Sequence, residues 1–368
     1  MKVLHLIDKS FLGGGQAAVR SLIAAARGSA VKPLLACRDG GPLVEAVRSA
    51  GVTVFPIPFD KRFRPGPARS IARIVREEGV DLLHGHGLVA TTFATLARTF
   101  FGARVPLIYQ QHGFHHHNYG PWTVGLRKAA ERAVCRRADR VVADSRADAA
   151  ELVASGYARS DRVGTIYVGM PEPEVSEAAS EAVRGELCLE PSRPLVGFVG
   201  RLHPQKGVDV FLRAAALVRR RIAGCQFVVV GDGALEAELM SLATELGLDG
   251  ALRWAGGRPD GPFLPLFDVA VLTSRWEGLP LVLLEYMAMR RPIVTTAVAG
   301  CLEAVGTDAA EVVAIDSPEK TAEAIVRLLC APDRAAALGE RARSRYLEQF
   351  TPSVTARRFE TLYQELLS

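Results

Sequence analysis

The sequence predicts two α/β domains in tandem, each with a parallel sheet covered by helices on both faces. Short apolar, β-branched runs alternate with helix-like stretches along most of the 368 residues, which is typical of doubly wound sheets. A stretch rich in Pro, Glu, Ser and Ala at 170–181 interrupts the pattern, which then restarts. We interpret this stretch as an interdomain linker and a surface segment. Because ligands bind at the carboxyl ends of such strands, we expect functional residues directly after each strand.

The first domain is predicted to span residues 1–170. Its strands are nearly continuous runs of apolar residues, as expected when both faces of a parallel sheet are covered. Helix-like stretches between them lie at 16–27, 66–78 and 123–138. The predicted strands lie at 2–7, 33–37, 52–57, 81–84, 105–110, 140–143 and 163–168.

The second domain is predicted to span residues 171–350. The stretch 280–290 is almost entirely apolar and predicts a helix. Pro280 suits the first turn of that helix, where its missing N–H costs nothing. The predicted strands of this domain lie at 194–200, 225–231, 251–256, 267–274, 292–296 and 311–315.

The composition is that of a globular protein, with 49% hydrophobic and 23% charged residues. No run of about 18 apolar residues occurs, so no membrane-spanning helix is expected. Asp8 and Lys9 interrupt the first apolar run too early for a signal peptide. The six cysteines are scattered without a C-x-x-C pair, which favours reduced thiols and a cytoplasmic location.

Positive charge is concentrated in the first domain. Residues 1–170 hold 24 Lys and Arg against 13 Asp and Glu, a net charge of +11, and the remainder carries −6. The helix-like stretch 123–140 is expected to pack Leu126 and Val134 inward. Its cations form either a solvated face or a docking surface for an anionic membrane at the inner face of the cell. No recognition motif accompanies the charge, so nucleic acid is not an expected partner. The cations are Arg127, Lys128, Arg132 and Arg136.

A glycine-rich loop follows the first strand and opens a helix, an arrangement that can bind an anion. Gly13, Gly15 and Ala18 formally match G-x-G-x-x-A, and Asp39 follows about 20 residues on, as in nicotinamide dehydrogenases. Five residues separate Ile7 from Gly13, however, whereas that fingerprint needs a tight turn directly off the strand. A third interpretation is that the loop is only a flexible glycine turn.

Two later loops carry charged residues directly after strands. Arg201 and Lys206 lie between a strand and a helix, where they form either a diphosphate site or two solvated surface cations. Glu277 lies in a polar loop, and Glu285 lies within the apolar helix that follows it. A buried carboxylate needs a partner, so Glu285 either accepts from a ligand's hydroxyl groups or pairs with a nearby arginine.

Five motifs occur in a characteristic order. An early Gly-Gly loop is followed by the pair His112-Gly113, by G-R-L-H-P-Q-K-G at 200–207, by V-G-D-G at 230–233, and by E-G-L-P-L-V-L-L-E at 277–285. Together they resemble the family 4 retaining glycosyltransferases, over most of the chain. The resemblance implies the GT-B fold, in which two Rossmann-like domains face across a cleft. A last helix, at 351–368, would cross back to the first domain.

The resemblance also implies a reaction. The donor would be a nucleoside diphosphate sugar, with a UDP-sugar favoured. The acceptor would be a hydroxyl group of a glycan, a glycolipid or a small soluble molecule, most readily in bacterial surface glycan assembly. No metal or other cofactor is expected, because fixed cations and helix N-termini can stabilise the leaving diphosphate. A GT-B sugar-nucleotide epimerase, a dehydrogenase and a non-catalytic basic binding protein stay open as alternatives.

By the same resemblance, Arg201 and Lys206 would neutralise the diphosphate and Glu285 would accept hydrogen bonds from the ribose. Glu277 would contact the transferred sugar. Pro280 departs from the glycine of many relatives and removes one backbone donor. The backbone that cradles sugar and phosphates would come from Gly14, Gly15, Gly278, Leu279, Pro280 and Leu281.

Histidines cluster in the first domain after the strand at 105–110. The resemblance places His112 against the donor sugar, as a catalytic residue that acts through its ring or its backbone. A metal site is not expected, because three adjacent histidines cannot all face one ion and no nearby Cys or Asp completes a ligand set. Candidates for the acceptor side are His86, His115, His116, Tyr119 and Trp122.

Overall fold

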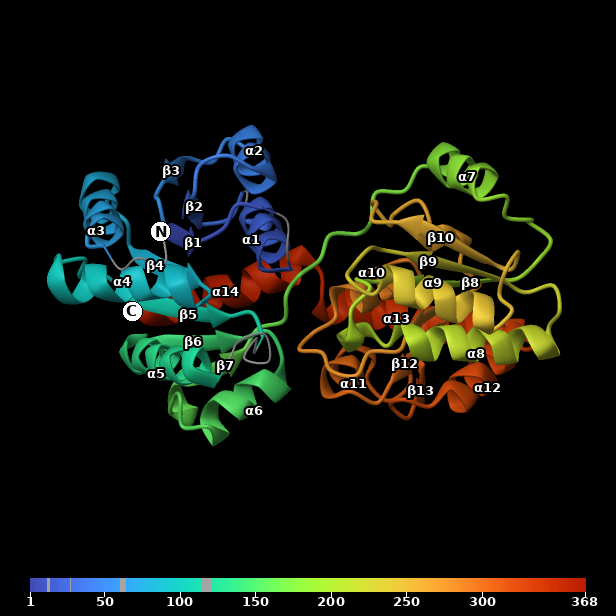
Figure 1. Cartoon of the computed structure of the whole chain (residues 1–368). Helices are drawn as coiled ribbons and strands as arrows, with labels where there is room; N and C mark the ends of the chain where they lie inside the picture. Colours follow the sequence, from blue (N-terminus) through green and yellow to red (C-terminus); the bar gives the residue numbers. More distant parts are fainter. Residues whose placement is uncertain (12–13, 27, 60–63, 114–120) are drawn as a thin grey trace. The chain divides into compact units, whose positions relative to one another are not determined.

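The computed structural model describes residues 1–11, 14–26, 28–59, 64–113 and 121–368. Their contacts divide the chain into two compact units (Figure 1). The first unit comprises Met1–Pro171 and Gln349–Ser368, and the second comprises Glu172–Glu348. Among the described residues, no helix has both the length and the apolar character needed to cross a bilayer.

The first unit is built on a seven-stranded parallel sheet in the order β3-β2-β1-β4-β5-β6-β7. The chain runs outward in one direction from β1 to β3 and in the other from β4 to β7, so the switch point lies between β1 and β4. The strands are β1 (Lys2–Ile7), β2 (Lys32–Cys37), β3 (Val54–Pro56), β4 (Leu82–His86), β5 (Leu107–Gln111), β6 (Arg140–Ala143) and β7 (Val163–Thr165). The helices are α1 (Gly14–Ala25), α2 (Pro42–Ser49), α3 (Gly66–Glu78), α4 (Leu88–Phe100), α5 (Pro121–Arg137), α6 (Arg146–Ala154) and α14 (Pro352–Leu367).

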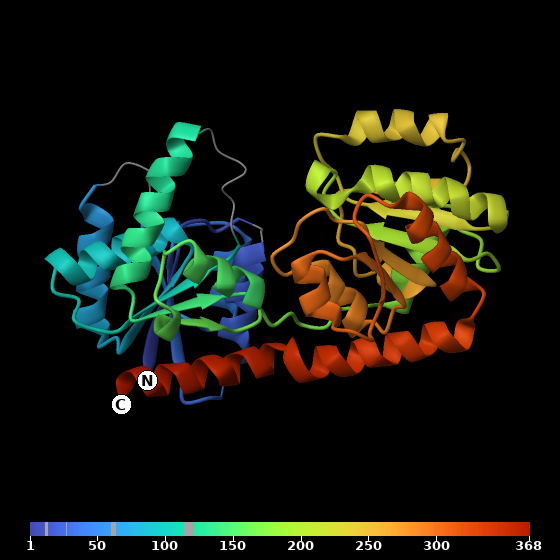
Figure 2. The same ribbon diagram turned by 90° about the horizontal axis from the view of Figure 1, so that it is seen from below.

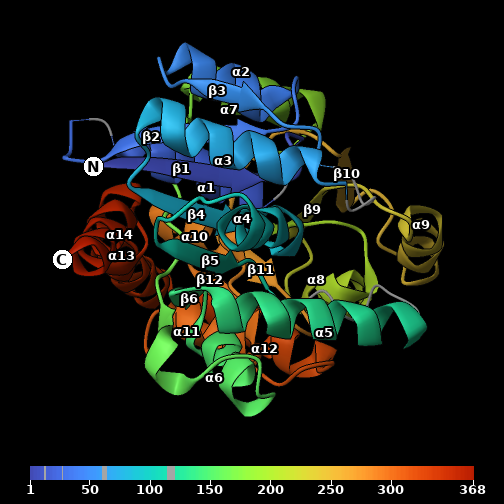
Figure 3. The ribbon, with the colours of Figure 1, turned by 90° about the vertical axis from the view of Figure 1, so that its left-hand side faces the viewer.

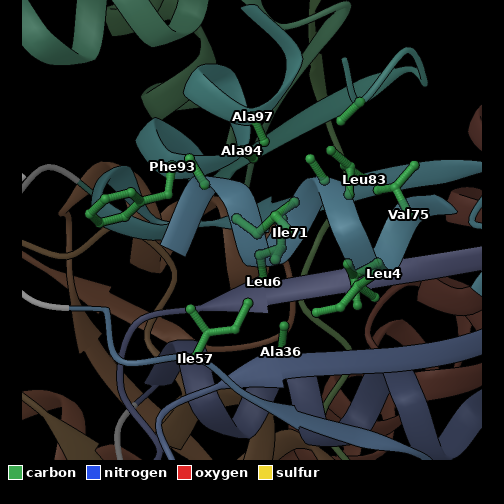
Figure 4. Packing of buried hydrophobic residues seen from close by; sticks show 14 of the residues in the cluster. Leu4, Leu6, Ala36, Ile57, Ile71, Val75, Leu83, Phe93, Ala94 and Ala97 are labelled. Carbon is green, nitrogen blue, oxygen red and sulfur yellow. The ribbon is translucent and has the colours of Figure 1, made fainter. Parts of the chain in front are cut away.

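One face of this sheet packs against α3 and α4. Side chains alternate along a strand, so Leu4 and Leu6 of β1 point to this face together with Leu83 of β4. They meet Ile71 of α3 and Phe93 of α4 in a fully buried core (Figure 4).

The opposite face packs against α1 and α14. Phe359 and Tyr363 of α14 share a core cluster with Val3 of β1 and Leu82 of β4. The last helix therefore completes the core of the first unit, where it crosses the early strands (Figure 2). In Figure 3, α14 and α4 lie on opposite sides of β1 and β4.

The second unit has a six-stranded parallel sheet in the order β10-β9-β8-β11-β12-β13, with its switch point between β8 and β11. Its strands are β8 (Leu195–Val199), β9 (Gln226–Val230), β10 (Leu252–Gly256), β11 (Val269–Leu272), β12 (Ile293–Thr296) and β13 (Glu311–Val313). Its helices are α7 (Glu177–Glu186), α8 (Val208–Arg221), α9 (Glu236–Glu245), α10 (Leu281–Ala288), α11 (Ala299–Val305), α12 (Pro318–Leu329) and α13 (Pro332–Gln349).

The expected linker and surface segment at 170–181 contains the start of α7, whose N-cap hydroxyl, that of Ser176, accepts from the backbone N–H of Ala179. Its apolar pattern is weak because most residues of α7 are exposed. One expectation for α5 was wrong. Leu126 does not pack inward but is 79% exposed, since only the later part of α5, from about Val134 on, joins the core over β5 and β6.

Candidate active site

Two loops of the second unit leave the sheet at the switch point between β8 and β11. The loop after β8 carries Arg201 and Lys206, and the loop after β11 carries Glu277. The structure brings Lys206 and Glu277 together, with 2.5 Å between Nζ and Oε1. Their side chains are only 12% and 8% exposed, so this is a largely buried ion pair.

Glu277 has two further partners. Ser274 Oγ donates to its Oε1 at 2.7 Å, and Gln205 Nε2 donates to its Oε2 at 3.3 Å. Arg201 is exposed and makes a 3.3 Å hydrogen bond to Gln205 Oε1. Sequence reasoning missed Ser274 and Gln205, although Ser274 lies three residues before Glu277 and Gln205 directly precedes Lys206 within its motif. An anion that binds Lys206 at this site has to compete with Glu277 for the ammonium group.

Three glycines of the motifs, together with Gly300 of α11, lie where neighbouring segments approach each other closely. A Cβ on Gly207 would overlap the carbonyl group of Thr273, and one on Gly231 would overlap that of Gly200. A Cβ on Gly233 would likewise overlap the carbonyl group of Leu202, and one on Gly300 would overlap that of Gly278. These glycines therefore hold the loops together at the ends of β8, β9 and β11, whatever the loops bind.

Gly207→Ala is expected to destabilise the protein more than Gly247→Ala. Both glycines have positive φ, 60° and 68°, so alanine at either position costs about 1–2 kcal/mol of backbone strain. At Gly207 the methyl group would also collide with the Thr273 carbonyl, whereas nothing lies within 4 Å of it at Gly247. Urea unfolding measures both losses, and equal losses would contradict the close approach.

Glu285 of α10 is paired with a second carboxyl group, that of Asp260, which follows β10. The two carboxyl groups interact, which disfavours two negative charges side by side and favours a proton on one of them. Burial, and then the negative charge of Asp260, raise the pKa of Glu285 well above its usual value. The alternative pairing of Glu285 with a neighbouring arginine is not seen: Arg290 pairs with Glu340, and Arg291 donates to backbone carbonyls such as that of Phe267.

Glu285→Gln is expected to raise the free energy of unfolding near neutral pH. Because the folded pKa of Glu285 is raised, the folded state binds the proton more tightly than the unfolded chain, whose pKa is about 4.3. Stability is therefore lost as pH rises from that value through the folded pKa. Thermal unfolding between about pH 4 and pH 8 should show a difference between variant and wild type that grows with pH. A constant difference would contradict the shared proton.

The predicted backbone cradle lies at the start of α10. The helix begins at Leu281, and Pro280 is its N-cap residue with an extended backbone. Gly278 and Leu279 are partly exposed in the loop before it. The first N–H groups of a helix have no partner inside it, and those of α10 follow Pro280 directly.

In the first unit, the structure places His112 beside Gly15. A Cβ on Gly15 would lie 3.2 Å from Cδ2 of His112, so the glycine lets the first turn of α1 pack on the imidazole ring. Gly14 opens α1 and is exposed. His112 also contacts a residue that the sequence did not single out: its Nδ1 lies 2.7 Å from Oδ2 of Asp144, which follows β6.

Among the acceptor-side candidates, the structure describes the side chain of His86. His86 is 1% exposed, because strand alternation turns it toward the face under α14, so it is a buried residue rather than an accessible acceptor contact. His115, His116 and Tyr119, and the side chain of Trp122, lie outside the described residues. Of the predicted basic surface, Lys128, Arg132 and Arg136 are exposed, whereas Arg127 is partly buried.

Comparisons with known proteins identify the family and the fold. Residues 12–171 match the family described as Glycosyltransferase Family 4, and residues 193–331 match Glycosyl transferases group 1. The chain is 31% identical to an alpha-D-kanosaminyltransferase from Streptomyces kanamyceticus, over 81% of this chain and 80% of that protein. It is 30% identical to a D-inositol 3-phosphate glycosyltransferase from Thermobispora bispora, over 90% of this chain and 83% of the relative.

Solved structures share the fold at lower identity. HepE from Anabaena, in complex with UDP and glucose, has a TM-score of 0.84 and 20% identity, and the match covers 99% of this chain and all of that one. A glycosyltransferase from Rickettsia africae has a TM-score of 0.86 and 17% identity, with 100% and 98% of the two chains covered. The chain thus belongs to the family 4 glycosyltransferases, which transfer a sugar from a nucleotide sugar, and it has their GT-B fold of two Rossmann-like units.

Proposed function

We propose that this protein transfers a sugar from a UDP-sugar to a hydroxyl group of its acceptor, with retention of the anomeric configuration. The observation that carries the proposal is the joint placement of Arg201, Lys206 and Glu277 in the two loops at the switch point of the second sheet. A planar guanidinium and an ammonium group suit a diphosphate, and a carboxylate held beside them suits a sugar hydroxyl.

In this proposal the bond between the anomeric carbon and the diphosphate oxygen breaks, and the acceptor oxygen bonds to that carbon. The acceptor's proton leaves with the nucleoside diphosphate. Arg201 and Lys206 stabilise the charge that develops on the leaving group. Glu277 and His112 contact the transferred sugar, and Glu285 accepts from the ribose. The backbone at Gly14, Gly15, Gly278, Leu279 and Leu281 completes the contacts, whereas Pro280 contributes shape without an N–H.

Uridine is the proposed base, since HepE, which shares the fold, has been solved with UDP and with UDP-glucose. For the acceptor we favour a small soluble hydroxyl compound, because the name of one relative specifies D-inositol 3-phosphate. The epimerase and dehydrogenase alternatives lose their support with the family assignment. Asp39, which the dehydrogenase reading required, is paired with Arg48 at the surface.

Calorimetric titration with UDP, GDP, ADP and NAD tests the donor. UDP is expected to bind, and Arg201→Ala is expected to weaken its binding about tenfold or more, the loss of about 1.4 kcal/mol or more that a charge-assisted hydrogen bond accounts for. Arg193→Ala, at an exposed ion pair with Glu190, is the matched control and should bind normally. Binding of NAD alone would overturn the proposal, and unchanged affinity of the Arg201 variant would remove the phosphate assignment.

A glycolipid acceptor at an anionic membrane is the second candidate. Lys128, Arg132 and Arg136 are exposed on α5, and Leu126 is 79% exposed on the same helix. Cations beside an exposed apolar side chain suit the surface of an anionic bilayer. Co-sedimentation with phosphatidylglycerol vesicles at low salt should then fall when the three cations are replaced with Gln. No binding by the wild type would leave only the soluble acceptor.

A further inference from the structure

Four histidines of the first unit lie on one side of its sheet. His5 of β1 pairs in register with His84 of β4, and His86 follows two positions later on the same face. His112 comes directly after β5, in phase with Gln110, which faces the same way. His5, His84 and His86 are at most 1% exposed. Histidines that are far apart in sequence thus meet beneath α14, near the carboxyl ends of the strands.

Three of these rings form a continuous hydrogen-bonded chain that ends on a carboxylate. Nδ1 of His5 lies 3.0 Å from Nε2 of His86, and Nδ1 of His86 lies 3.2 Å from Nε2 of His112. Nδ1 of His112 lies 2.7 Å from Oδ2 of Asp144. The rings of His86 and His112 are nearly parallel, 7° apart. Asp144 is held in turn by Gln110 Nε2, which donates to its other oxygen at 2.8 Å.

The carboxylate determines which nitrogen of each ring carries the hydrogen. Ionised Asp144 can only accept, so Nδ1 of His112 must donate. With His112 neutral, its Nε2 accepts from Nδ1–H of His86, whose Nε2 then accepts from Nδ1–H of His5. Burial lowers the pKa of His5 to about 3 and that of His86 well below its usual value, so both rings are neutral near pH 7.

His84 stands outside this chain. Its Nδ1 lies 2.7 Å from the hydroxyl of Tyr363, and its Nε2 has no hydrogen-bond partner among the described residues. The nitrogens of His5, His84 and His86 lie within 4.8 Å of one another, as a metal site would require. The hydrogen bonds favour the chain instead, because His5 Nδ1 and His86 Nε2 are already used on each other.

We propose that His5, His86 and Asp144 are positioning residues that hold His112 as the Nδ1–H tautomer, with its ring against Gly15. Both ring nitrogens of His112 are then occupied. The ring therefore contacts the transferred sugar only through its carbon atoms, and any polar contact to the sugar comes from the His112 backbone. His112 then neither donates nor accepts a proton in the reaction. This inference rests on the proposed function insofar as His112 contacts the sugar.

Two variants of His86 separate hydrogen bonding from packing. His86→Asn keeps a donor N–H close to the place of Nδ1, whereas His86→Phe keeps a flat ring and has no donor. Tyr363→Phe, which removes the bond to His84 and leaves the chain intact, is the control. The tautomers are read from ¹⁵N NMR of histidine-labelled full-length protein with EDTA at about pH 8.5, well above the ordinary histidine pKa of about 6.5. Transfer from UDP-sugars and UDP affinity are measured in parallel.

We expect Nδ1–H signals for His5, His86 and His112 in the wild type and the control. His86→Phe should lose that signal for His112 and lower kcat about 10- to 100-fold, by analogy with the loss when the partner that orients a metal-ligating histidine is removed. UDP affinity should hardly change, and His86→Asn should restore most of kcat. The inference is overturned if His112 is the Nε2–H tautomer or if both His86 variants lose activity equally. It is also overturned if Zn²⁺, added to a sample without EDTA, moves the signals of the buried histidines. Normal tautomers in a protein without any transferase activity would instead count against the proposed function alone.

Discussion

Glu277→Gln is expected to reduce kcat for sugar transfer about 10²- to 10³-fold, the loss usual when one group that stabilises the transition state is removed. The variant should bind UDP more tightly than the wild type does. In the wild type, Glu277 occupies the ammonium group of Lys206 at 2.5 Å, and a diphosphate has to displace it. The neutral amide of Gln leaves that ammonium group open to the phosphate while it removes the charged contact to the sugar.

Steady-state kinetics and UDP titration measure the two effects on the same preparation. Glu340→Gln is the matched control, because Glu340 forms an ion pair with Arg290 that is more than half exposed, and neither kcat nor UDP affinity should change. Weaker UDP binding by Glu277→Gln would mean that the carboxylate supports the phosphate site and does not compete for it. A kcat near that of the wild type would remove Glu277 from the reaction.

Lys206→Met is expected to weaken UDP binding strongly and to lower the free energy of unfolding by about 2–3 kcal/mol. Removing one member of a buried ion pair leaves the other charged group without its counterion, which costs about 3–5 kcal/mol. Glu277 still accepts hydrogen bonds from Ser274 and Gln205, so we expect a loss of stability at the lower end of that range or below it. Urea unfolding measures the loss, which should be larger than for any substitution in an exposed pair such as Lys320–Glu323.

The double variant Lys206→Met, Glu277→Gln distinguishes stability from binding. It contains no unpaired charge, so much of the stability should return. UDP affinity should stay low, because the cation for the diphosphate is still missing. If stability and UDP affinity recovered together, the Lys206 variant would have lost binding through unfolding, and the phosphate assignment would fail.

Much of the fold was readable from local pattern. Apolar runs such as 194–200 and 267–274 contain strands β8 and β11, and the residues after them, Arg201, Lys206 and Glu277, lie at the predicted strand ends. This worked because parallel strands with two covered faces must be apolar and must alternate with helices. Element boundaries were less accurate where the pattern is weak, as at α7, whose residues are mostly exposed.

The partners within the candidate sites were not readable in this way. Glu285 carried a clear signal, a carboxylate in an apolar helix, but its partner turned out to be Asp260 rather than an arginine. His5 was embedded in the apolar run 2–7, and nothing in its immediate neighbours indicates a contact with His86, 81 residues later. Asp144 directly follows a predicted strand, so its position at a strand end was the one signal that could have found it.

The sequence by itself determined the tandem parallel sheets, the motif order and the strand ends that carry the candidate functional residues. Apolar periodicity and glycine placement are local properties of the sequence, so they can be recognised without knowing which distant segments are neighbours in the fold. The tertiary structure decided which strand ends meet. Strand order places β8 beside β11, which brings Lys206 beside Glu277. It also places β1, β4, β5 and β6 side by side, and the hydrogen-bonded chain of residues from these strands depends on that order. The chain consists of His5, His86, His112 and Asp144. Such contacts depend on crossovers between distant segments, which no local pattern encodes.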